Sequence, residues 1–294
     1  LAPLLLTDST DRERSPLDVP GAVLVTTGLL ALVFGVTRAG EEGFTDPWAV
    51  AAMLASVVLL VAFWRAESHH PHPLVPTAIL RRRTIGWGNA AGFVTFSMES
   101  SLVFLLTLYL QHVLDLTPLQ TGLTLGGLGL GAILGGVTGP RVIATFGVRG
   151  ALVGGLAVQA VFTALLLLVG PAVGWIWLVL GATFLGAIGH VCVIVGFMVA
   201  ATSGLPDHEQ GLATGLATMT QQVGVAMGVP VMSAVATTVG SLESLGALRV
   251  AIGVDAAVVA AAALLVATQL RGEPAPVAGA NEDVRADGEV PASA

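Results

Sequence analysis

Charged side chains are scarce in this sequence. Asp, Glu, Lys and Arg make up 11% of its 294 residues and apolar residues 54%, whereas about 25% of an average soluble domain is charged. Lysine is absent, and the net charge of −7 gives no basic surface for nucleic acid. The single cysteine, Cys192, excludes a disulfide scaffold and a site built from several thiolates. The composition therefore argues against a water-soluble globule and against a nucleic-acid-binding protein.

Motifs of catalysis are also missing. The sequence contains no Walker loop, no G-x-S-x-G, no H-E-x-x-H and no paired carboxylates on an aqueous loop. The run His69-His70-Pro71-His72 resembles a metal-binding tract, but no cysteine and few carboxylates accompany it in its proline-rich loop. We therefore expect a protein that is not an enzyme, with no catalytic residue and no metal site.

Long apolar runs are what the sequence has in abundance. A helix needs about 20 apolar residues to cross the hydrocarbon core of a bilayer. Runs such as 57–63 and 256–267 are apolar on every side, which favours helices over the alternating strands of a β-barrel. The sequence predicts an all-α polytopic membrane protein with eight transmembrane helices. The predicted spans are 20–37, 47–64, 86–110, 119–139, 150–169, 174–202, 211–239 and 248–270.

Arginine positions predict the orientation. Ten of the twelve arginines fall in the N-terminal segment, the even-numbered loops or the tail, which all lie on one side of this topology. Only Arg38 and Arg249 fall on the other side. Because basic residues concentrate in cytoplasmic loops, we expect a multi-pass protein of the cell membrane with both termini in the cytoplasm.

Apart from Arg249, the second residue of the last predicted span, only two acidic or basic side chains fall inside predicted spans, Glu99 and Asp255. Glu99 follows Gly86 by thirteen residues, about 20 Å along a helix and close to the bilayer midplane. It shares a small and polar helix face with Thr95, and Asn89 lies at the edge of that face. Such a face favours a partner helix or a wet cavity over lipid. Glu99 is either a carboxyl group that exchanges a proton or meets a cationic ligand, or a protonated side chain hydrogen-bonded to a neighbouring helix.

Asp255 and His190 receive simpler interpretations. Asp255 lies about 10 Å into the last span from the outer side, and we expect it to reach water. His190 lies deep in the sixth span between Gly186 and Gly196. A neutral histidine packed against close backbones is favoured there over a proton relay.

The seventh span carries two adjacent amides, Gln221 and Gln222. They belong to a small and polar stripe that includes Gly211, Gly215 and Thr218. Amides at this depth suit helix–helix hydrogen bonding and ligand recognition equally well.

Several short motifs together resemble one known family. They are Leu17-Asp18-x-x-Gly21, Pro73-Leu74-Val75, Tyr109-Leu110-Gln111, Pro118-Leu119-Gln120-Thr121-Gly122, and Gly211 to Gly228 with Gln221-Gln222-Val223-Gly224 at its centre. In this order and spacing the sequence resembles the C-terminal eight spans of fourteen-span drug:proton antiporters of the EmrB/QacA type, in the major facilitator superfamily. The chain keeps Gly147 and Arg149 of the family's cytoplasmic loop but lacks its usual Asp-Arg pair.

The resemblance implies a division of the chain. It comprises a cytoplasmic linker (1–19), two linker transmembrane helices (20–64), a cytoplasmic loop (65–85), a six-helix transporter half (86–270) and a disordered cytoplasmic tail (271–294). The six-helix half is expected to consist of two three-helix repeats in inverted topology.

The same resemblance implies a function and partners. The expected function is secondary active export of hydrophobic or cationic drugs or metabolites, driven by the proton gradient without a cofactor. The expected partners are the lipid bilayer, a small-molecule substrate and an N-terminal six-span half of the same protein. The candidate residues for proton coupling or the substrate cavity are Glu99, Asn89, Thr95, Gln221, Gln222 and His190. The alternative is a self-contained eight-span protein that acts as a scaffold, a channel subunit or an intramembrane enzyme.

Overall fold

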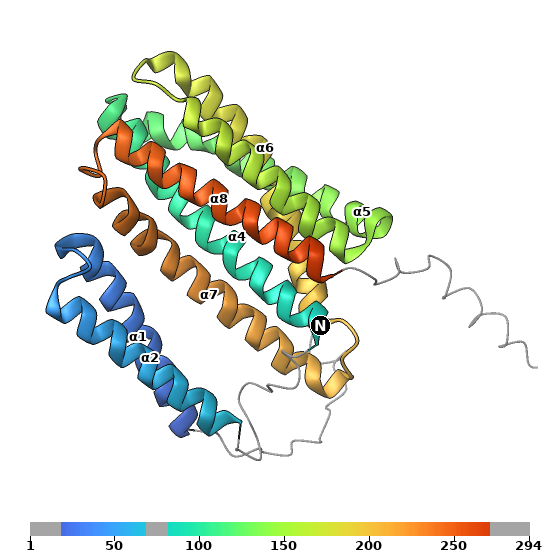
Figure 1. Cartoon of the computed structure of the whole chain (residues 1–294). Helices are drawn as coiled ribbons and strands as arrows, with labels where there is room; N and C mark the ends of the chain where they lie inside the picture. The colour runs from blue at the N-terminus through green and yellow to red at the C-terminus, as the bar shows by residue number, and fades with distance from the viewer. Residues whose placement is uncertain (1–18, 69–81, 271–294) are drawn as a thin grey trace, which may run out of the picture.

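The computed structural model describes residues 19–68 and 82–270, and these residues form helices joined by short turns, with no strand among them (Figure 1). The all-helical prediction is therefore confirmed for these ranges. The predicted tail, nearly all of the N-terminal linker and the His69–His72 run lie outside the described residues.

The first two helices, α1 (Val19–Glu42) and α2 (Pro47–Glu67), form an antiparallel pair. Gly43, with a φ of 95°, opens the turn between them. Asp46 then caps α2 by accepting a hydrogen bond from the Ala49 N–H and pairs with Arg38 at 2.8 Å. The Ala49 N–H, together with Arg38, holds the pKa of the Asp46 carboxyl below its usual range.

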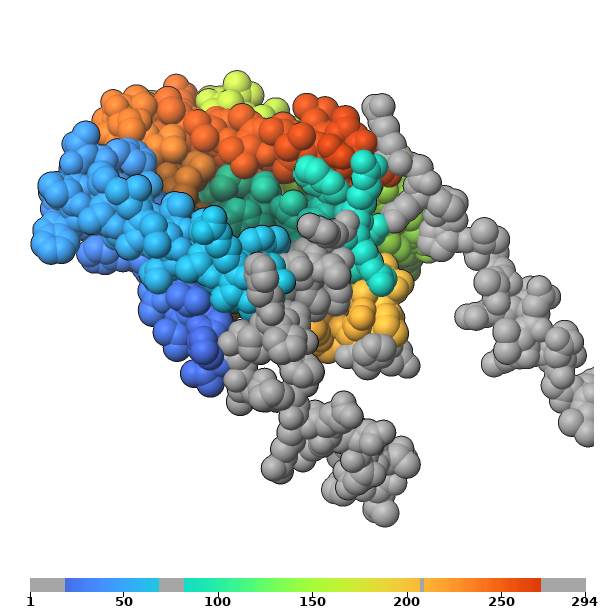
Figure 2. All heavy atoms as spheres, turned by 60° about the horizontal axis from the view of Figure 1, so that its bottom comes forward, coloured from blue at the N-terminus to red at the C-terminus, as the bar shows by residue number. Residues whose placement is uncertain are grey.

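The α1–α2 pair lies at one side of the molecule, where α1 packs against α7 (Figures 1 and 2). Gly40 of α1 approaches the backbone of Ala234 and the carbonyl of Pro230. α7 (Asp207–Thr237) remains helical through Pro230.

The remaining helices surround α4 (Arg83–Leu108), which ends in a π-helical turn at Tyr109–Val113. α4 packs against α6 (Ile176–Thr202), α7 and α8 (Leu245–Gln269). The central position of α4 means that a polar residue on any of its faces meets another helix.

α5 (Pro118–Leu165) consists of two helical arms, and the chain reverses direction between them. Its first arm runs parallel to α6, because Gly127 lies against Leu180 and Gly139 against Val195. Its second arm runs antiparallel to α6, because Gly155 lies against Val193 and residue 162 against residue 186. The reversal occurs at Gly147, whose φ of 72° and ψ of 176° are non-helical and fall in a region that is essentially restricted to glycine.

The predicted spans 119–139 and 150–169 thus correspond to the two arms of α5, which meet at the non-helical Gly147. Six of the described helices are long and apolar enough to cross a membrane. The two arms of α5 are counted as one of these six helices. α7 is not among them, because its threonines, glycines and amides lower its mean hydropathy. Large apolar side chains such as Leu54, Leu119, Trp177 and Leu264 are exposed, as on a surface that faces lipid. The chain is therefore a multi-pass membrane protein, and the structure yields six helices that meet this criterion in place of the eight predicted.

Candidate functional site

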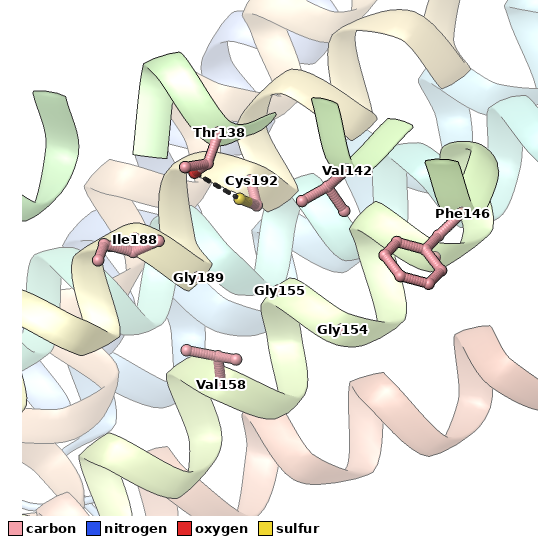
Figure 3. Close-up of a pocket in the computed structure, with 10 residues that line it drawn as sticks. Thr138, Val142, Phe146, Gly154, Gly155, Val158, Ile188, Gly189 and Cys192 are labelled. Carbon is pink, nitrogen blue, oxygen red and sulfur yellow. Dashed lines mark hydrogen bonds between the residues drawn. The ribbon is translucent and has the colours of Figure 1, made fainter. Parts of the chain in front are cut away.

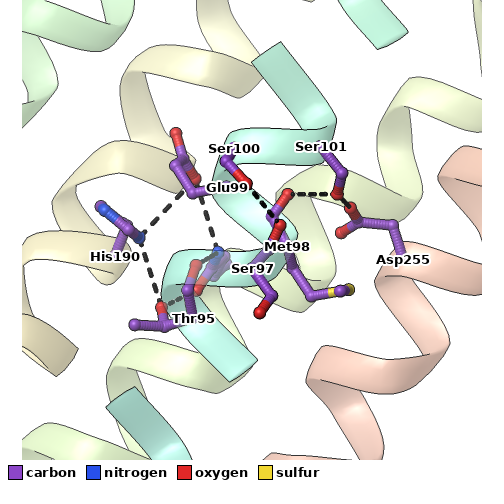
Figure 4. A network of polar contacts seen from close by, with 9 residues as sticks. Thr95, Ser97, Met98, Glu99, Ser100, Ser101, His190 and Asp255 are labelled. Carbon is purple, nitrogen blue, oxygen red and sulfur yellow. Dashed lines mark hydrogen bonds and ion pairs between the residues drawn. The ribbon is translucent and has the colours of Figure 1, made fainter. Parts of the chain in front are cut away.

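A buried polar cluster lies between α4, α5 and α6 (Figure 4). Glu99 of α4 places Oε2 at 3.7 Å from Nδ1 of His190 on α6. Nε2 of Gln159 on α5 donates to the same carboxylate oxygen at 3.4 Å. Thr95, one turn before Glu99, donates to Oε1 of Gln159 at 2.5 Å and lies 3.3 Å from Nδ1 of His190. Three helices thus contribute to one hydrogen-bonded group, which we call the Glu99 cluster: Thr95, Glu99, Gln159 and His190.

Glycines bring the three helices close enough for these contacts. A Cβ on Gly155 of α5 would lie 2.6 Å from the carbonyl oxygen of Gly189, and a Cβ on Gly189 would lie 2.6 Å from the carbonyl oxygen of Gly155. On the other side, Gly92 of α4 lies against the ring of Phe197 on α6. Small residues at helix crossings in membranes allow this close approach, and here they set the separation of the side chains one turn away.

The Glu99 cluster is almost closed to its surroundings. The side chains of His190 and Glu99 are 11% and 14% exposed. The ring of Phe96 meets His190 edge-on at 5.8 Å between centroids. A small cavity adjoins Glu99 and is lined by Gln159, Thr163 and Ala187 among others. Glu99 therefore has polar partners on α5 and α6 and adjoins only a small space, which Gln159 also lines.

The geometry places an acid beside a base. Oε2 of Glu99 and Nδ1 of His190 lie 3.7 Å apart, which is ion-pair distance but longer than a hydrogen bond. Gln159 and Thr95 are neutral, so their hydrogen bonds orient Glu99 and His190 without adding a charge to the cluster. Glu99 and His190 are therefore the two ionisable groups of the Glu99 cluster.

The structure brings together three of the six predicted site residues: Thr95, Glu99 and His190. Asn89 is buried elsewhere, where it donates to the carbonyl of Ile85 and accepts a hydrogen bond from Thr220 of α7. The sequence argument missed Gln159. It is the sole amide in the predicted span 150–169, and a lone amide in an apolar span is the signal that identifies it.

The two amides of α7 lie away from the Glu99 cluster. Gln221 is half-buried and Gln222 is exposed. The stripe that contains Gln222 is exposed along its first turns, and a Cβ on Gly211 or Gly215 would have no described atom within 4 Å. Within the described residues this face of α7 is therefore unpacked, although its composition is poorly suited to lipid.

The expectation that Asp255 reaches water is wrong. Asp255 is 1% exposed, and its Oδ2 lies at hydrogen-bond distance, 2.7 Å, from the hydroxyl oxygen of Ser101 on α4. Depth along a helix does not determine which way a side chain points. The face of α8 that carries Asp255 packs against α4, so water is excluded at a depth where a lipid-facing residue would reach it.

A separate apolar groove of about 510 Å³ lies between the two arms of α5 and α6 (Figure 3). Val142, Phe146, Val158 and Ile188 contribute its larger side chains, and the hydroxyl of Thr138 approaches Sγ of Cys192 at 3.9 Å. None of the residues that line it carries a charge. This groove suits an apolar group and has no means of binding a proton.

A comparison with protein families decides the affiliation of this helical bundle. The model of the Major Facilitator Superfamily matches residues 19–229 and, in a second overlapping match, 89–291. The chain belongs to the Major Facilitator Superfamily.

Relatives of this superfamily member include antibiotic resistance and export proteins of actinomycetes. It is 34% identical over 231 residues to a lincomycin resistance protein of Streptomyces lincolnensis, covering 78% of this chain and 47% of that protein. It is 33% identical over 228 residues to a puromycin resistance protein of Streptomyces alboniger, covering 75% and 44%. It is 31% identical over 224 residues to a cephamycin export protein of Amycolatopsis lactamdurans, covering 74% and 46%. The chain thus spans a little under half the length of each of these relatives.

Proposed function

We propose that this chain acts as the C-terminal part of a proton-coupled drug exporter of the fourteen-span EmrB/QacA type. Its substrates are hydrophobic or cationic antibiotics or related metabolites. The observation that carries the proposal is the Glu99 cluster, a carboxyl–imidazole pair enclosed by three helices of a major facilitator chain. Antibiotic resistance and export relatives support the substrate class.

Proton exchange at Glu99 follows from its surroundings. A carboxyl group removed from water retains its proton, whereas the same group in contact with water and a cationic partner ionises. Glu99 is nearly buried in the described state and adjoins a small cavity. When that cavity opens to water on one side of the membrane, the proton of Glu99 passes to water, and the imidazole of His190, 3.7 Å away and beyond hydrogen-bond distance, acts on the carboxylate electrostatically. Alternation between these states couples the proton gradient to movement of the helices.

The eight-span topology is part of the proposal. The two arms of α5 are antiparallel around Gly147, so each can cross the bilayer separately. α7 is 31 residues long and packs between α1 and α4, which makes it a span despite its polar face. Counted in this way, α1, α2, α4, the two arms of α5, α6, α7 and α8 give eight spans.

The arginines support an orientation with both termini in the cytoplasm. Arg82 donates to the carbonyl of Gly204 after α6, and Arg149 donates to Ala267 near the end of α8. These contacts place both arginines at one end of the bundle, together with the Gly147 turn. Arg249 donates to Val169 at the opposite end. The basic residues thus concentrate at one end, which the positive-inside tendency assigns to the cytoplasm of a cell-membrane protein.

The exposed stripe of α7 is where this chain would meet the N-terminal six-span half. Gly211, Gly215, Thr218 and Gln222 present small and polar groups on an unpacked helix face. In major-facilitator transporters the substrate site lies between the two halves. We therefore assign Gln222 to the wall of the shared cavity, and we place Gln221 and Asn89 behind it as residues that position α7 against α4.

Dye uptake by everted membrane vesicles tests the function, because an exporter moves its substrate into such vesicles. Vesicles from cells that express the protein from its natural coding region are placed in a solution of a fluorescent cationic dye, and a pH gradient with an acidic interior is imposed. The wild type is expected to move the dye only while the gradient persists. Glu99→Gln preserves size and hydrogen bonding but removes titration, so transport is expected to fall to the level of vesicles without the protein, with normal amounts in the membrane.

Glu243→Gln is the matched control, because the Glu243 side chain is 69% exposed and lies in the turn before α8. It should transport like the wild type. Unchanged transport in the Glu99→Gln variant would show that Glu99 is structural. Wild-type efflux that is indifferent to the pH gradient would refute proton coupling itself.

A further inference from the structure

A second carboxyl group is buried on the opposite side of α4 from the Glu99 cluster (Figure 4). Asp255 of α8 is 1% exposed, and its Oδ2 lies 2.7 Å from Oγ of Ser101. Its other oxygen, Oδ1, is buried with no hydrogen-bond partner among the described residues. The function proposed above makes no use of Asp255.

The hydrogen bonds of Ser101 bear on the charge of Asp255. Oγ of Ser101 also lies 2.9 Å from the carbonyl oxygen of Met98, one turn earlier on α4. A hydroxyl group has a single hydrogen to donate. Both contacts are satisfied at once only if Ser101 donates to Met98 and a protonated Asp255 donates to Ser101. An ionised Asp255 would leave one of the two contacts without a hydrogen.

The surroundings of Asp255 also disfavour an ionised carboxylate. A buried carboxylate needs a cation or several donors to offset the loss of hydration. Within the described ranges no arginine or histidine lies at ion-pair distance from Asp255. A neutral carboxyl group, by contrast, tolerates an unpartnered Oδ1 at much lower cost, because that atom then carries no net charge.

The titratable groups around Asp255 are few. α4 contributes Glu99, which acts on Asp255 electrostatically. The π turn after α4 contributes Tyr109, whose hydroxyl donates to the carbonyl of Gly170, and His112, which is exposed. α7 has no titratable residue between positions 211 and 237, and residues 166–168, which also contact α8, are all leucine. On α8 itself Arg249 is bound to the carbonyl of Val169. α5, which also packs against α8, carries Arg141 and Arg149, and Arg149 donates to the carbonyl of Ala267. The titratable group that acts on Asp255 from a neighbouring helix is therefore another carboxyl group, that of Glu99.

We propose that Asp255 and Ser101 form a second proton-binding site, which is separate from Glu99 and occupied by a proton while α8 packs against α4. The proton leaves when α8 separates from α4 and water reaches Oδ1. Glu99 and Ser101 are two residues apart on α4 and point to different helices, so the two sites lie on either side of one helix. Because two ionised carboxylates repel each other, release from one site favours retention at the other. The occupancy of this site is independent of the proposed export function, whereas its contribution to proton counting rests on that function.

Infrared difference spectroscopy on the purified full chain in lipid nanodiscs tests the occupancy directly. A protonated carboxyl group shows a C=O stretching band that a carboxylate lacks. At neutral pH the wild type is expected to show a band that disappears in Asp255→Asn and persists in Glu99→Gln and Glu243→Gln. Ser101→Ala should retain the band at a higher frequency, because the carboxyl group loses its hydrogen-bond partner.

Two outcomes would overturn the proposal. One is an unchanged protonated-carboxyl spectrum in Asp255→Asn, and the other is a band that does not move in Ser101→Ala. Circular dichroism and size-exclusion profiles identify a variant that fails to fold. If Asp255→Asn fails to fold, Ser101→Ala still tests the proposal, because it retains Asp255. A wild type with the Asp255 band but without gradient-driven efflux would refute the export function and leave the proton site intact. Gradient-driven efflux in a wild type that lacks the Asp255 band would refute the proton site and leave the export function intact.

If the wild type shows both the Asp255 band and gradient-driven transport, the vesicle assay tests whether the Asp255 proton is released during transport. Asp255→Asn should lower the slope of steady-state dye accumulation against the imposed pH difference, because fewer protons move per substrate. Glu99→Gln should remove accumulation altogether. An unchanged slope in Asp255→Asn would show that the Asp255 proton remains bound throughout the cycle, contrary to the release proposed here.

Discussion

The close contact between Gly155 of α5 and Gly189 of α6 sets the geometry of the Glu99 cluster, and Gly155→Ala perturbs it in a calculable way. The added Cβ would lie 2.6 Å from the Gly189 carbonyl oxygen and 2.7 Å from Cγ2 of Val193. Ordinary contacts between such atoms are about 3.5 Å, so the helices must separate by roughly 1 Å. Gln159 on α5 and His190 on α6 both contact Glu99, so separating these two helices lengthens the two contacts, and the Gln159–Glu99 hydrogen bond, already 3.4 Å long, would exceed hydrogen-bond distance.

Overpacking of this kind costs about 1–3 kcal/mol. A free-energy loss of 1 kcal/mol lowers the midpoint of thermal unfolding by about 2–4 °C in a domain of 150–250 residues. Gly155→Ala is therefore expected to lower that midpoint by roughly 2–12 °C, measured by a thermal-shift assay on the purified protein in detergent. Gradient-driven efflux should decrease as well, because Gln159 no longer orients Glu99.

Gly154→Ala is the matched control. Gly154 is the adjacent residue on the same arm of α5, and a Cβ there meets no described atom within 4 Å. Both variants gain the same helix propensity, about 1 kcal/mol for Gly→Ala, so their difference isolates the contact with α6. A Gly155→Ala protein as stable as Gly154→Ala, with equal efflux, would refute the argument that this contact positions the cluster.

Two further variants test the fold around the site. Gly147→Ala is expected to destabilise the protein by about 1–3 kcal/mol, because only glycine readily adopts the backbone conformation at which α5 reverses; a thermal-shift midpoint equal to that of Gly154→Ala would contradict this. Tyr109→Phe removes a buried hydroxyl that donates to the Gly170 carbonyl at 2.7 Å, so we expect a loss of about 1–3 kcal/mol in unfolding free energy without loss of efflux at permissive temperature. A Tyr109→Phe protein with full stability would show that this carbonyl finds another donor.

Much of the helical scaffold could be predicted from the apolar runs alone. In a bilayer the backbone must satisfy its own hydrogen bonds, so a long apolar run has few alternatives to a helix. The predicted runs 119–139 and 150–169 match the two arms of α5, which lie on either side of the non-helical Gly147. What hydropathy did not show is that glycines of both arms pack against the same helix, α6.

The candidate site divides in the same way. Glu99 was identified from its sequence because a carboxylate near the bilayer midplane is costly and stands out in a chain with few charges. Gln159 was missed, and Asp255 was misplaced, because each depends on which helix covers which face. Periodicity gives the relative direction of side chains on one helix, but it does not identify which neighbouring helix packs against each face.

The sequence by itself therefore determined the solvent of this protein, its helical class and the position of one acidic side chain, Glu99, near the bilayer midplane, since these follow from the free energy of transferring side chains and backbone into lipid. Tertiary structure alone decided that Glu99 meets His190 and Gln159, and that Asp255 is shielded by α4. Those contacts arise where glycines let helices approach closely, and the choice among possible helix neighbours is made by packing over the whole bundle.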